Sequence, residues 1–317
     1  MKDKRRTIFT NSYVLMILAL ISCFLWGSAF PSVKSGYNLF TIGSGDTYEK
    51  IVFAGYRFFL SSIMIFVFCV VTGRSLKLNK DHVPKVISLG LMQTSIQYMF
   101  FYIGLSNTSG TLGSIISASN TFFAVILAHF FFSRDKLTYR KFAGVVLGFT
   151  GVIIANMTGN GLRAGFTLTG EGFIIISSLV GALAAIYTKK IAENISPFAI
   201  SGYQLFFGSL ILIIVGWLGG GKHISFTPEG TLLLLYLGFI SAAAFTLWSI
   251  LLKYNDVGRV SIYKFTIPLF GTLLSYLILK ERFLGFNVAL AAILVSLGIL
   301  LINMKSGTAI LSKTKKQ

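Results

Sequence analysis

Two cationic side chains fall inside long apolar stretches of this sequence, where an ionised group is costly. Lys264 comes one helical turn before Pro268, and Arg57 lies in an earlier stretch. A proline inside a helix removes one backbone donor and leaves a carbonyl free. A cation beside such a break could bind a carboxylate or phosphate, so we predict that Lys264 contacts an anionic part of a bound solute. The alternative is that Lys264 extends to polar headgroups.

The other ionisable groups indicate little reactive chemistry. Arg57 fits a structural role, bonding carbonyls or anchoring at headgroups, better than solute contact. His129 has no partner at a metal-binding spacing, so a packed or hydrogen-bonded histidine is favoured over a proton relay. Cys23 and Cys69 form no metal or disulfide pattern, and we expect no metal or cofactor. No Asp or Glu falls at the centre of an apolar stretch, which predicts transport with little dependence on a proton gradient.

Polar and aromatic side chains at mid-depth are the next candidates for binding a solute. Gln93, Gln97 and Tyr98 share one helical face, and Tyr102 follows four residues later. Buried polar groups also hold helices together, and Trp or Tyr near helix ends is typical of the lipid interface, which is the favoured interpretation for Tyr187 and Trp248. The predicted substrate-binding residues are Trp26, Gln93, Gln97, Tyr98, Tyr102, Asn120, Tyr187, Trp248 and Lys264.

Composition places these residues in an all-α integral membrane protein. Of 317 residues, 54% are hydrophobic and only 12% are charged. Soluble domains carry about 25% charged residues, and apolar runs of about 20 residues span a bilayer. We predict ten transmembrane helices, at 13–32, 50–71, 84–105, 110–132, 139–157, 169–188, 198–217, 230–251, 258–279 and 284–303.

The basic residues predict the orientation of these helices. Most of the 28 Lys and Arg residues fall in segments on the same side as the two chain ends. The positive-inside rule therefore places both termini in the cytoplasm, with the protein in the plasma membrane and in contact with its lipids. The net charge of +18 is accounted for in this way, because the cations form short blocks without a continuous basic face that would bind nucleic acid.

The sequence also repeats itself. Ala54 to Ser62 reads AGYRFFLSS, and Ser201 to Ser209, 147 residues later, reads SGYQLFFGS. Each half holds five predicted helices, an odd number, so the second half must enter the membrane the other way up. We therefore predict two inverted five-helix repeats, residues 1–160 and 161–317, around a central cavity, as in many secondary transporters.

Short motifs in this order resemble the EamA-type ten-helix branch of the drug/metabolite transporter superfamily. They are Leu25-Trp26-Gly27-Ser28 followed by Pro31 and Lys34, then Arg57-Phe58, then Pro268 followed by Glu281. The resemblance implies export of small metabolites or amino acids by alternating access, with Pro31 and Pro268 as hinge residues. Departures from the family pattern are Phe122 in place of proline, Asp135 in place of glutamate, and Lys280 in place of glycine. The missing proline predicts a fourth helix straighter than the ninth.

Two other functions compete with transport of small solutes. A lipid or lipid-linked sugar flippase shares much of the architecture. An integral membrane enzyme is less favoured, because the sequence has no Asp-rich prenyl-diphosphate motif, no His box and no Ser–His pair with elbow glycines. Gly144-x-x-x-Gly148 offers a small-residue face, for packing within a monomer or, as the lesser alternative, in a homodimer.

Overall fold

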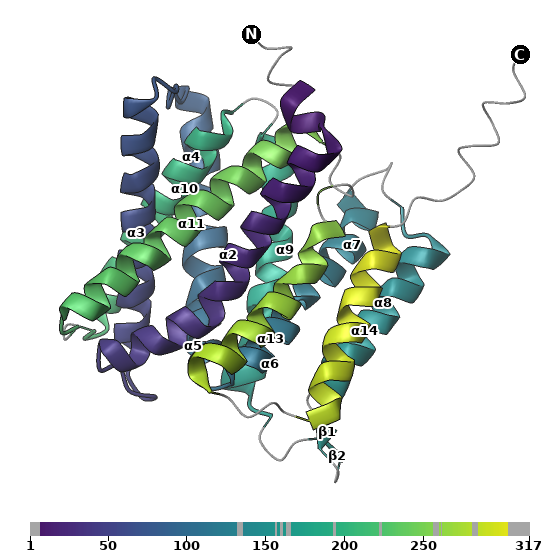
Figure 1. Ribbon diagram of the computed structural model, residues 1–317. Coiled ribbons are helices and arrows are strands. Elements are labelled where there is room, and N and C mark those ends of the chain that lie inside the picture. Colours follow the sequence, from purple (N-terminus) through teal and green to yellow (C-terminus); the bar gives the residue numbers. More distant parts are fainter. Residues whose placement is uncertain are drawn as a thin grey trace, which may run out of the picture.

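The computed structural model describes residues 7–131, 136–155, 157–158, 161–162, 166–192, 195–221, 224–255, 260, 262–280 and 285–303. Within these ranges the chain is a bundle of long helices with one short antiparallel pairing of β1 (Met157–Thr158) with β2 (Gly161–Leu162) (Figure 1). Asp135 and Glu281, two of the family-motif positions, lie outside the described residues.

Each of the ten predicted ranges contains a helix. Seven helical runs in the described part are long and apolar enough to cross a membrane. Their bounds are Ser12–Leu39 (α2), Thr47–Val71 (α3), Lys80–Ser106 (containing α4, Val83–Leu89, and α5, Gln97–Ser106), Gly110–Phe131 (α6, Gly110–Ser117, and α7, Ser119–Phe131), Leu168–Ile191 (containing α9, Phe173–Ile191), Pro197–Leu218 (α10) and Pro228–Tyr254 (α11). Shorter helices occupy the other three ranges, at Tyr139–Ala155 (α8), Thr266–Leu279 (α13) and Gly285–Asn303 (α14).

The outer surface of the bundle is apolar. Large aliphatic and aromatic side chains stay exposed along several helices, including Val70, Val71, Phe130 and Leu232, at 77%, 79%, 75% and 69%. Exposed apolar area on this scale suits contact with lipid rather than water. The chain is therefore a multi-pass membrane protein.

Whether the fourth range is straighter than the ninth stays a prediction, because both are irregular. The helix after Ser109 is interrupted without a proline. It breaks at Ala118, where α6 ends and α7 begins. Ser119 Oγ donates to the Ile116 carbonyl at 2.6 Å, and Ala118 N–H bonds three residues back, to Ile115. Serine hydroxyls that compete for backbone acceptors can bend a helix without a proline.

The ninth range is also irregular, and so is the third. A 3-10 turn at Ile262–Phe265 precedes α13, and Pro268 is the third residue of that helix. Pro31 is buried inside α2. A π-helical turn at Gly90–Ile96 interrupts the third range, where irregular backbone often marks a functional site.

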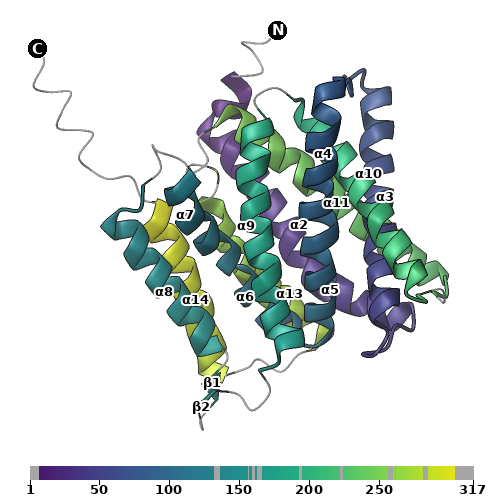
Figure 2. The same ribbon diagram turned by 180° about the vertical axis from the view of Figure 1, so that it is seen from behind.

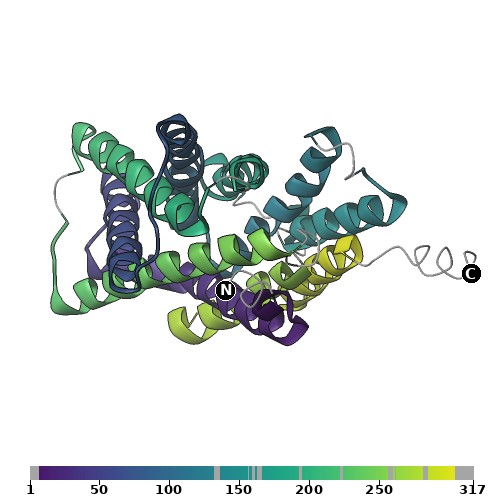
Figure 3. The same cartoon turned by 90° about the horizontal axis from the view of Figure 1, so that it is seen from above.

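Helices from the two halves of the chain pack against each other throughout. The α3–α10 pair forms one end of the bundle and the α8–α14 pair the other (Figures 1 and 3). Between them α2 contacts α11 and α13, while on the opposite face α9 contacts α5 and α7 (Figure 2). Each half therefore completes the core of the other.

The packing contacts repeat with the same offset as the sequence. A Cβ on Gly55 would lie 2.6 Å from Ile213, and one on Gly202 would lie 2.7 Å from Phe66. Adding 147 to 55 and to 66 gives 202 and 213, so Gly55 is equivalent to Gly202 and Phe66 to Ile213, and the offset exchanges the two contacts.

The α8–α14 contact follows the same rule. A Cβ on Gly151 would meet the Ala291 carbonyl at 2.9 Å, and one on Gly298 would meet the Gly144 carbonyl at 2.6 Å. The offset of 147 converts one contact into the other. Gly144-x-x-x-Gly148 thus packs inside the bundle, because a backbone with small residues admits close approach.

Candidate functional site

A cavity of about 200 Å³ lies where helices from both halves meet. Its walls come from α2, α3, α5, α6, α7, α9, α10, α11 and α13, with the π-helical turn at Gly90–Ile96 and the 3-10 turn at Ile262–Phe265. They combine cations, amides, hydroxyls and aromatic rings, and hold no carboxylate among the described residues. The lining is Trp26, Ala29, Phe30, Arg57, Gln93, Gln97, Tyr98, Phe101, Ser117, Ala118, Asn120, Thr121, Ser177, Ser178, Gly181, Ala185, Thr188, Ile200, Gln204, Phe245, Trp248, Ser249, Leu252, Lys264 and Ile267.

Lys264 stands on one wall beside two indole rings. Its Nζ lies 5.2 Å from the centroid of the Trp248 ring, a cation–π contact. The Trp248 ring in turn packs edge-on against Trp26 at 5.1 Å. Within the described chain no hydrogen-bond acceptor is paired with the Lys264 ammonium, which keeps its three donors for a solute or water in the cavity.

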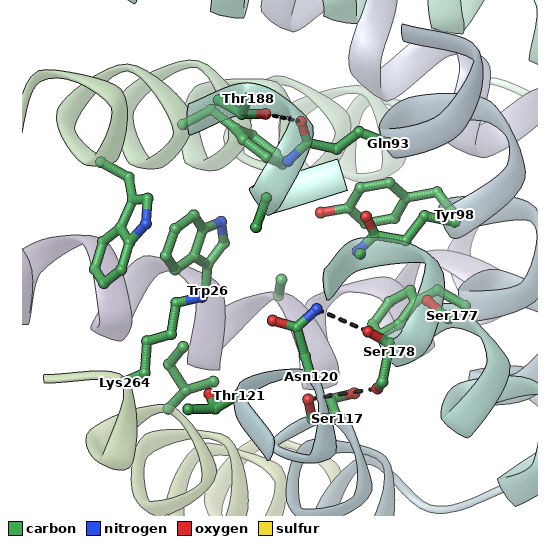
Figure 4. Close-up of a pocket in the computed structure, with 18 of the residues that line it drawn as sticks. Trp26, Gln93, Tyr98, Ser117, Asn120, Thr121, Ser177, Ser178, Thr188 and Lys264 are labelled. Atoms are coloured by element: carbon green, nitrogen blue, oxygen red, sulfur yellow. Dashed lines mark hydrogen bonds between the residues drawn. The ribbon is translucent and has the colours of Figure 1, made fainter. Parts of the chain in front are cut away.

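The opposite wall presents amide groups, drawn in Figure 4. Asn120 points into the cavity, and its Nδ2 donates to the Ser178 carbonyl at 2.9 Å, which leaves Oδ1 facing the space near Trp26 and Lys264. Gln97 Oε1 is buried without a partner in the described structure. These two oxygens are acceptors for an N–H or O–H of a bound molecule.

Gly181 on α9 holds these amides close to the helix backbone. A Cβ at this position would lie 2.6 Å from Asn120 Nδ2 and 2.8 Å from Gln97 Nε2. Glycine leaves room for both amides where they stand, and a larger residue would require the ends of these side chains to shift.

Arg57 is 1% exposed and enters the wall from α3. Its Nε donates to Ser241 Oγ at 3.0 Å, and Nη1 donates to Tyr102 Oη at 3.1 Å. No described carboxylate pairs with it. Arg57 therefore joins α3 to α5 and α11 while adding a second positive charge to the cavity.

Gln204 on α10 stands at the position 147 residues after Arg57 and lines the same cavity. It is 2% exposed, and its Oε1 accepts a hydrogen bond from Thr94 Oγ1 at 3.2 Å. Ser117 likewise stands 147 residues before Lys264. Both pairs of equivalent positions thus meet at one site.

Seven of the nine predicted substrate-binding residues line the cavity, where their contact with a substrate remains a prediction. Trp248 is only 9% exposed, which does not fit the interfacial position expected for it. Tyr102 and Tyr187 are outside the lining. Tyr102 is fully buried against Arg57, and Tyr187 Oη lies 3.1 Å from Ser88 Oγ near the end of α9. His129 accepts a hydrogen bond at Nδ1 from the Leu137 N–H.

Several lining residues were not predicted from the sequence. They are mostly small hydroxyl-bearing side chains from α9 and its neighbours, which resemble ordinary helix-packing residues in a sequence. Extending the 147-residue offset from Lys264 and Arg57 would have found Ser117 and Gln204. The same offset from Tyr102 gives Ser249, whereas Ser177, Ser178 and Thr188 had no such signal from a predicted binding residue.

Comparison with known proteins decides the family. The model of the EamA-like transporter family matches residues 14–157 and again residues 168–304. The chain belongs to the EamA-like transporter family. The two matches cover most of its length, one in each half.

Relatives agree with this assignment. An uncharacterized transporter of Archaeoglobus fulgidus is 24% identical over 92% of this chain and 98% of its own. The uncharacterized transporter YetK of Bacillus subtilis is 27% identical over 73% of this chain and 71% of its own. A WAT1-related chloroplastic protein of Arabidopsis thaliana is 22% identical, over 90% of this chain and 68% of its own length. These names support a transport function and point away from catalysis.

A solved crystal structure has the same fold. It superimposes with a TM-score of 0.69 at 14% identity, covering 96% of this chain and 99% of the other. At this identity the likeness concerns architecture alone.

Proposed function

We propose that this EamA-family protein is a secondary transporter that exports small metabolites carrying a carboxylate, such as amino acids, by alternating access. The observation that carries the proposal is the charge of the cavity. Lys264 and Arg57 both line it, and no described lining residue is acidic. Charges within a membrane protein mark solute pathways, and two unopposed cations favour an anionic group.

The arrangement of the walls supports a zwitterionic solute. The ammonium of Lys264 would take the carboxylate, since its donors have no acceptor in the described chain. Gln97 Oε1 and Asn120 Oδ1 would accept from an amino group on the other side. The Trp26 and Trp248 rings, 5.1 Å apart, offer an apolar surface to the rest of the molecule.

The exchange of contacts between halves supports ten spans arranged as two inverted repeats. Gly55 with Ile213 and Gly202 with Phe66 are the same contact viewed from each half. A pseudo-two-fold axis of this kind lets two access states interconvert by an exchange of conformations between repeats. With both termini cytoplasmic in the plasma membrane, the positive-inside bias is satisfied.

The breaks in the fourth and ninth ranges are suitable hinges. Ala118 and the junction between Phe265 and Thr266 lie at equivalent positions, and each adjoins cavity residues. Pro268 lies close to the second break, and Pro31 provides a third irregular site in α2. Such positions absorb backbone rotation while the packed helix pairs move as units.

The test begins with a search for the solute. Cells overproducing the protein are challenged with growth-inhibitory amino acids, carboxylates and amines, and the compound that resistance selects is then used in counterflow with proteoliposomes. We expect resistance to carboxylate-bearing compounds and trans-stimulated uptake of them. Selection of amines without a carboxylate would refute the substrate class. Translocation of a fluorescent phospholipid, with no counterflow of any solute, would favour the flippase instead.

A further inference from the structure

The two cations of the cavity contact different parts of α11. Arg57 Nε donates to Ser241 Oγ at 3.0 Å, and Lys264 Nζ lies 5.2 Å from the centroid of the Trp248 ring. Both partners belong to α11, where seven residues make about two turns and rise roughly 10 Å along the axis. A single carboxylate is small beside two helical turns, so each cation has its own place for an anion.

Aromatic rings form the wall between the two cations. The Trp26 ring lies 5.1 Å from the Trp248 ring and 5.9 Å from Phe245, measured between centroids. Tyr98 follows at 6.5 Å from Phe245, and all four rings line the cavity. Figure 4 shows Lys264 and Tyr98 on opposite sides of the cavity. This aromatic strip offers an apolar surface to a short carbon chain that extends away from Lys264.

Arg57 stands at the other end of the aromatic strip. The Tyr98 ring packs on the Phe58 ring at 4.3 Å, and the Arg57 guanidinium carbon lies 5.1 Å from the centroid of the same Phe58 ring. A molecule that lies along the strip would therefore have Lys264 at one end and Arg57 at the other.

The Arg57 guanidinium has donors to spare. It has five N–H groups, of which one on Nε and one on Nη1 are used by Ser241 and Tyr102. The other three have no acceptor in the described part of the chain. Because Arg57 is 1% exposed and no described carboxylate pairs with it, it is a buried charge without a counter-ion, which is costly. A carboxylate suits such a group, since a guanidinium binds it through two parallel hydrogen bonds.

Asn120 gives the molecule a direction along the strip. Its Oδ1 faces the space near Lys264, because Nδ2 is held by the Ser178 carbonyl (Figure 4). A carboxylate at Lys264 can therefore have an amino group beside it that donates to Asn120. The rest of the molecule would then extend toward Arg57.

We propose that the solute carries two carboxylates, one bound by Lys264 and the other by Arg57, as in an acidic amino acid or a short dicarboxylate. This rests on the proposed function, because it concerns the same cavity. Each carboxylate cancels one of the two cationic charges, whereas a zwitterion with one carboxylate leaves the net charge of the cavity unchanged. Arg57 is then the residue that selects for the second carboxylate, in addition to joining three helices.

Matched pairs of ligands test this by binding, without any transport step. L-Glutamate and L-glutamine have nearly the same size and differ by a carboxylate or an amide at the end of the side chain. L-Aspartate and L-asparagine repeat the comparison at a shorter length, and glutarate and its monoamide repeat it without an amino group. An acid preference in the amino acid pairs alone would identify an acidic amino acid, and an equal preference in the glutarate pair a dicarboxylate.

Binding is measured by tryptophan fluorescence of the purified protein in detergent. Two of the three tryptophans, Trp26 and Trp248, line the cavity. Trp217 is 49% exposed on α10, and Trp217→Phe removes its background. The signal of this variant then comes from the aromatic strip itself.

We expect the acid to bind at least about tenfold more tightly than its amide in the pair whose length fits, because the hydrogen bonds to Arg57 become charge-assisted on both sides. Arg57→Gln should bring this ratio of dissociation constants close to one, and Arg57→Lys should keep part of it. Lys264→Met should weaken the acid and the amide alike, and so preserve the ratio. Lys50→Gln removes another cation that is 1% exposed but outside this cavity, and should leave the ratio unchanged.

Equal affinities for acid and amide in every wild-type pair would overturn the second carboxylate site, and would leave transport of single carboxylates intact. This comparison needs no variant, so it decides the matter even if Arg57→Gln does not fold. A ratio that survives in folded Arg57→Gln would overturn the assignment to Arg57. Failure of the proposed function has a different result: no carboxylate, single or double, would change the fluorescence or show counterflow, and the second site would fall with it.

Discussion

The two halves of this protein share a frame but differ in chemistry at the centre. Arg57 in the first half corresponds to Gln204 in the second, and Ser117 in the first corresponds to Lys264 in the second. All four line the same cavity. By contrast, the 147-residue offset converts one glycine contact of the α3–α10 pair into the other glycine contact of the same pair. The same holds within the α8–α14 pair.

This difference separates what a carrier must keep symmetric from what it can vary. In the proposed alternating-access cycle, helix crossings determine whether both conformations are packed equally well, so they would tolerate little divergence. Side chains around the cavity need only suit a solute, and a solute has no two-fold symmetry. A positive charge on one side of each equivalent pair therefore gives the cavity a direction that the frame lacks.

The largest expected effect comes from breaking the frame. In Gly208→Val the new Cβ would lie 2.4 Å from Thr94 Cβ and 2.5 Å from the Gly90 carbonyl, against backbone that cannot yield. Overpacking of this kind costs about 3 kcal/mol or more. Thermal unfolding in detergent should show a large fall in midpoint, or no folded protein. Gly45→Ala, in open space, should unfold like the wild type, and an unchanged midpoint for Gly208→Val would contradict the described crossing.

The next effect concerns the charge at one equivalent pair. Lys264→Met removes the unpaired ammonium and makes the site as neutral as Ser117, so counterflow of a carboxylate-bearing substrate should fall at least about tenfold. Lys264→Arg keeps the charge and should keep a substantial part of the rate. The comparison is made at equal amounts of folded protein in the vesicles. Wild-type transport by the methionine variant would refute the role of Lys264.

The other equivalent pair should respond unequally. Arg57→Leu would leave Ser241 Oγ and Tyr102 Oη without their hydrogen-bond donor, and should lower the free energy of unfolding by about 2 kcal/mol. Gln204→Leu would leave only Thr94 Oγ1 without its acceptor, and should lower the free energy of unfolding by about 1 kcal/mol. Thermal midpoints of the two variants check the order. Equal losses would mean that Arg57 contributes no more to the frame than its neutral equivalent.

The smallest expected effect is that of the proton gradient. No described acidic side chain lines the cavity, and Glu171, the buried carboxylate at the start of the sixth range, has its oxygens bonded to Thr108 and to the Thr167 N–H. Collapsing the pH gradient in proteoliposomes should change the initial counterflow rate less than about twofold. Loss of uptake would show that a group outside the cavity couples transport to protons.

The positions of the helices could be predicted from the sequence, because apolar runs and basic blocks follow from the bilayer itself. The cavity was predicted in part. Gln93, Gln97 and Tyr98 share a face that the helical period exposes, whereas Tyr102 on the same row faces Arg57 instead. The π-helical turn at Gly90–Ile96 contains Gln93 and ends just before Gln97, so it changes the angular spacing between them, and no sequence period reports such a turn.

The break at Ala118 could not be predicted from the missing proline. The hydroxyls of Ser114 and Ser119 each donate to a backbone carbonyl three residues back, but serine is also common in straight membrane helices. Likewise Trp248 and Tyr187 have the same sequence context near helix ends. Only tertiary packing places one against Trp26 and the other beside Ser88.

The exchange of the Gly151 and Gly298 contacts has an evolutionary consequence. A shorter ancestor with one five-helix unit would have made each of these contacts twice, between two copies inserted in opposite directions. If the halves are the proposed inverted repeats, joining the copies into one chain would have fixed the orientation of each, and a substitution such as lysine at 264 could then alter one side of the cavity alone. Gene fusion would thus have been the step that allowed this carrier to become specific for an asymmetric molecule.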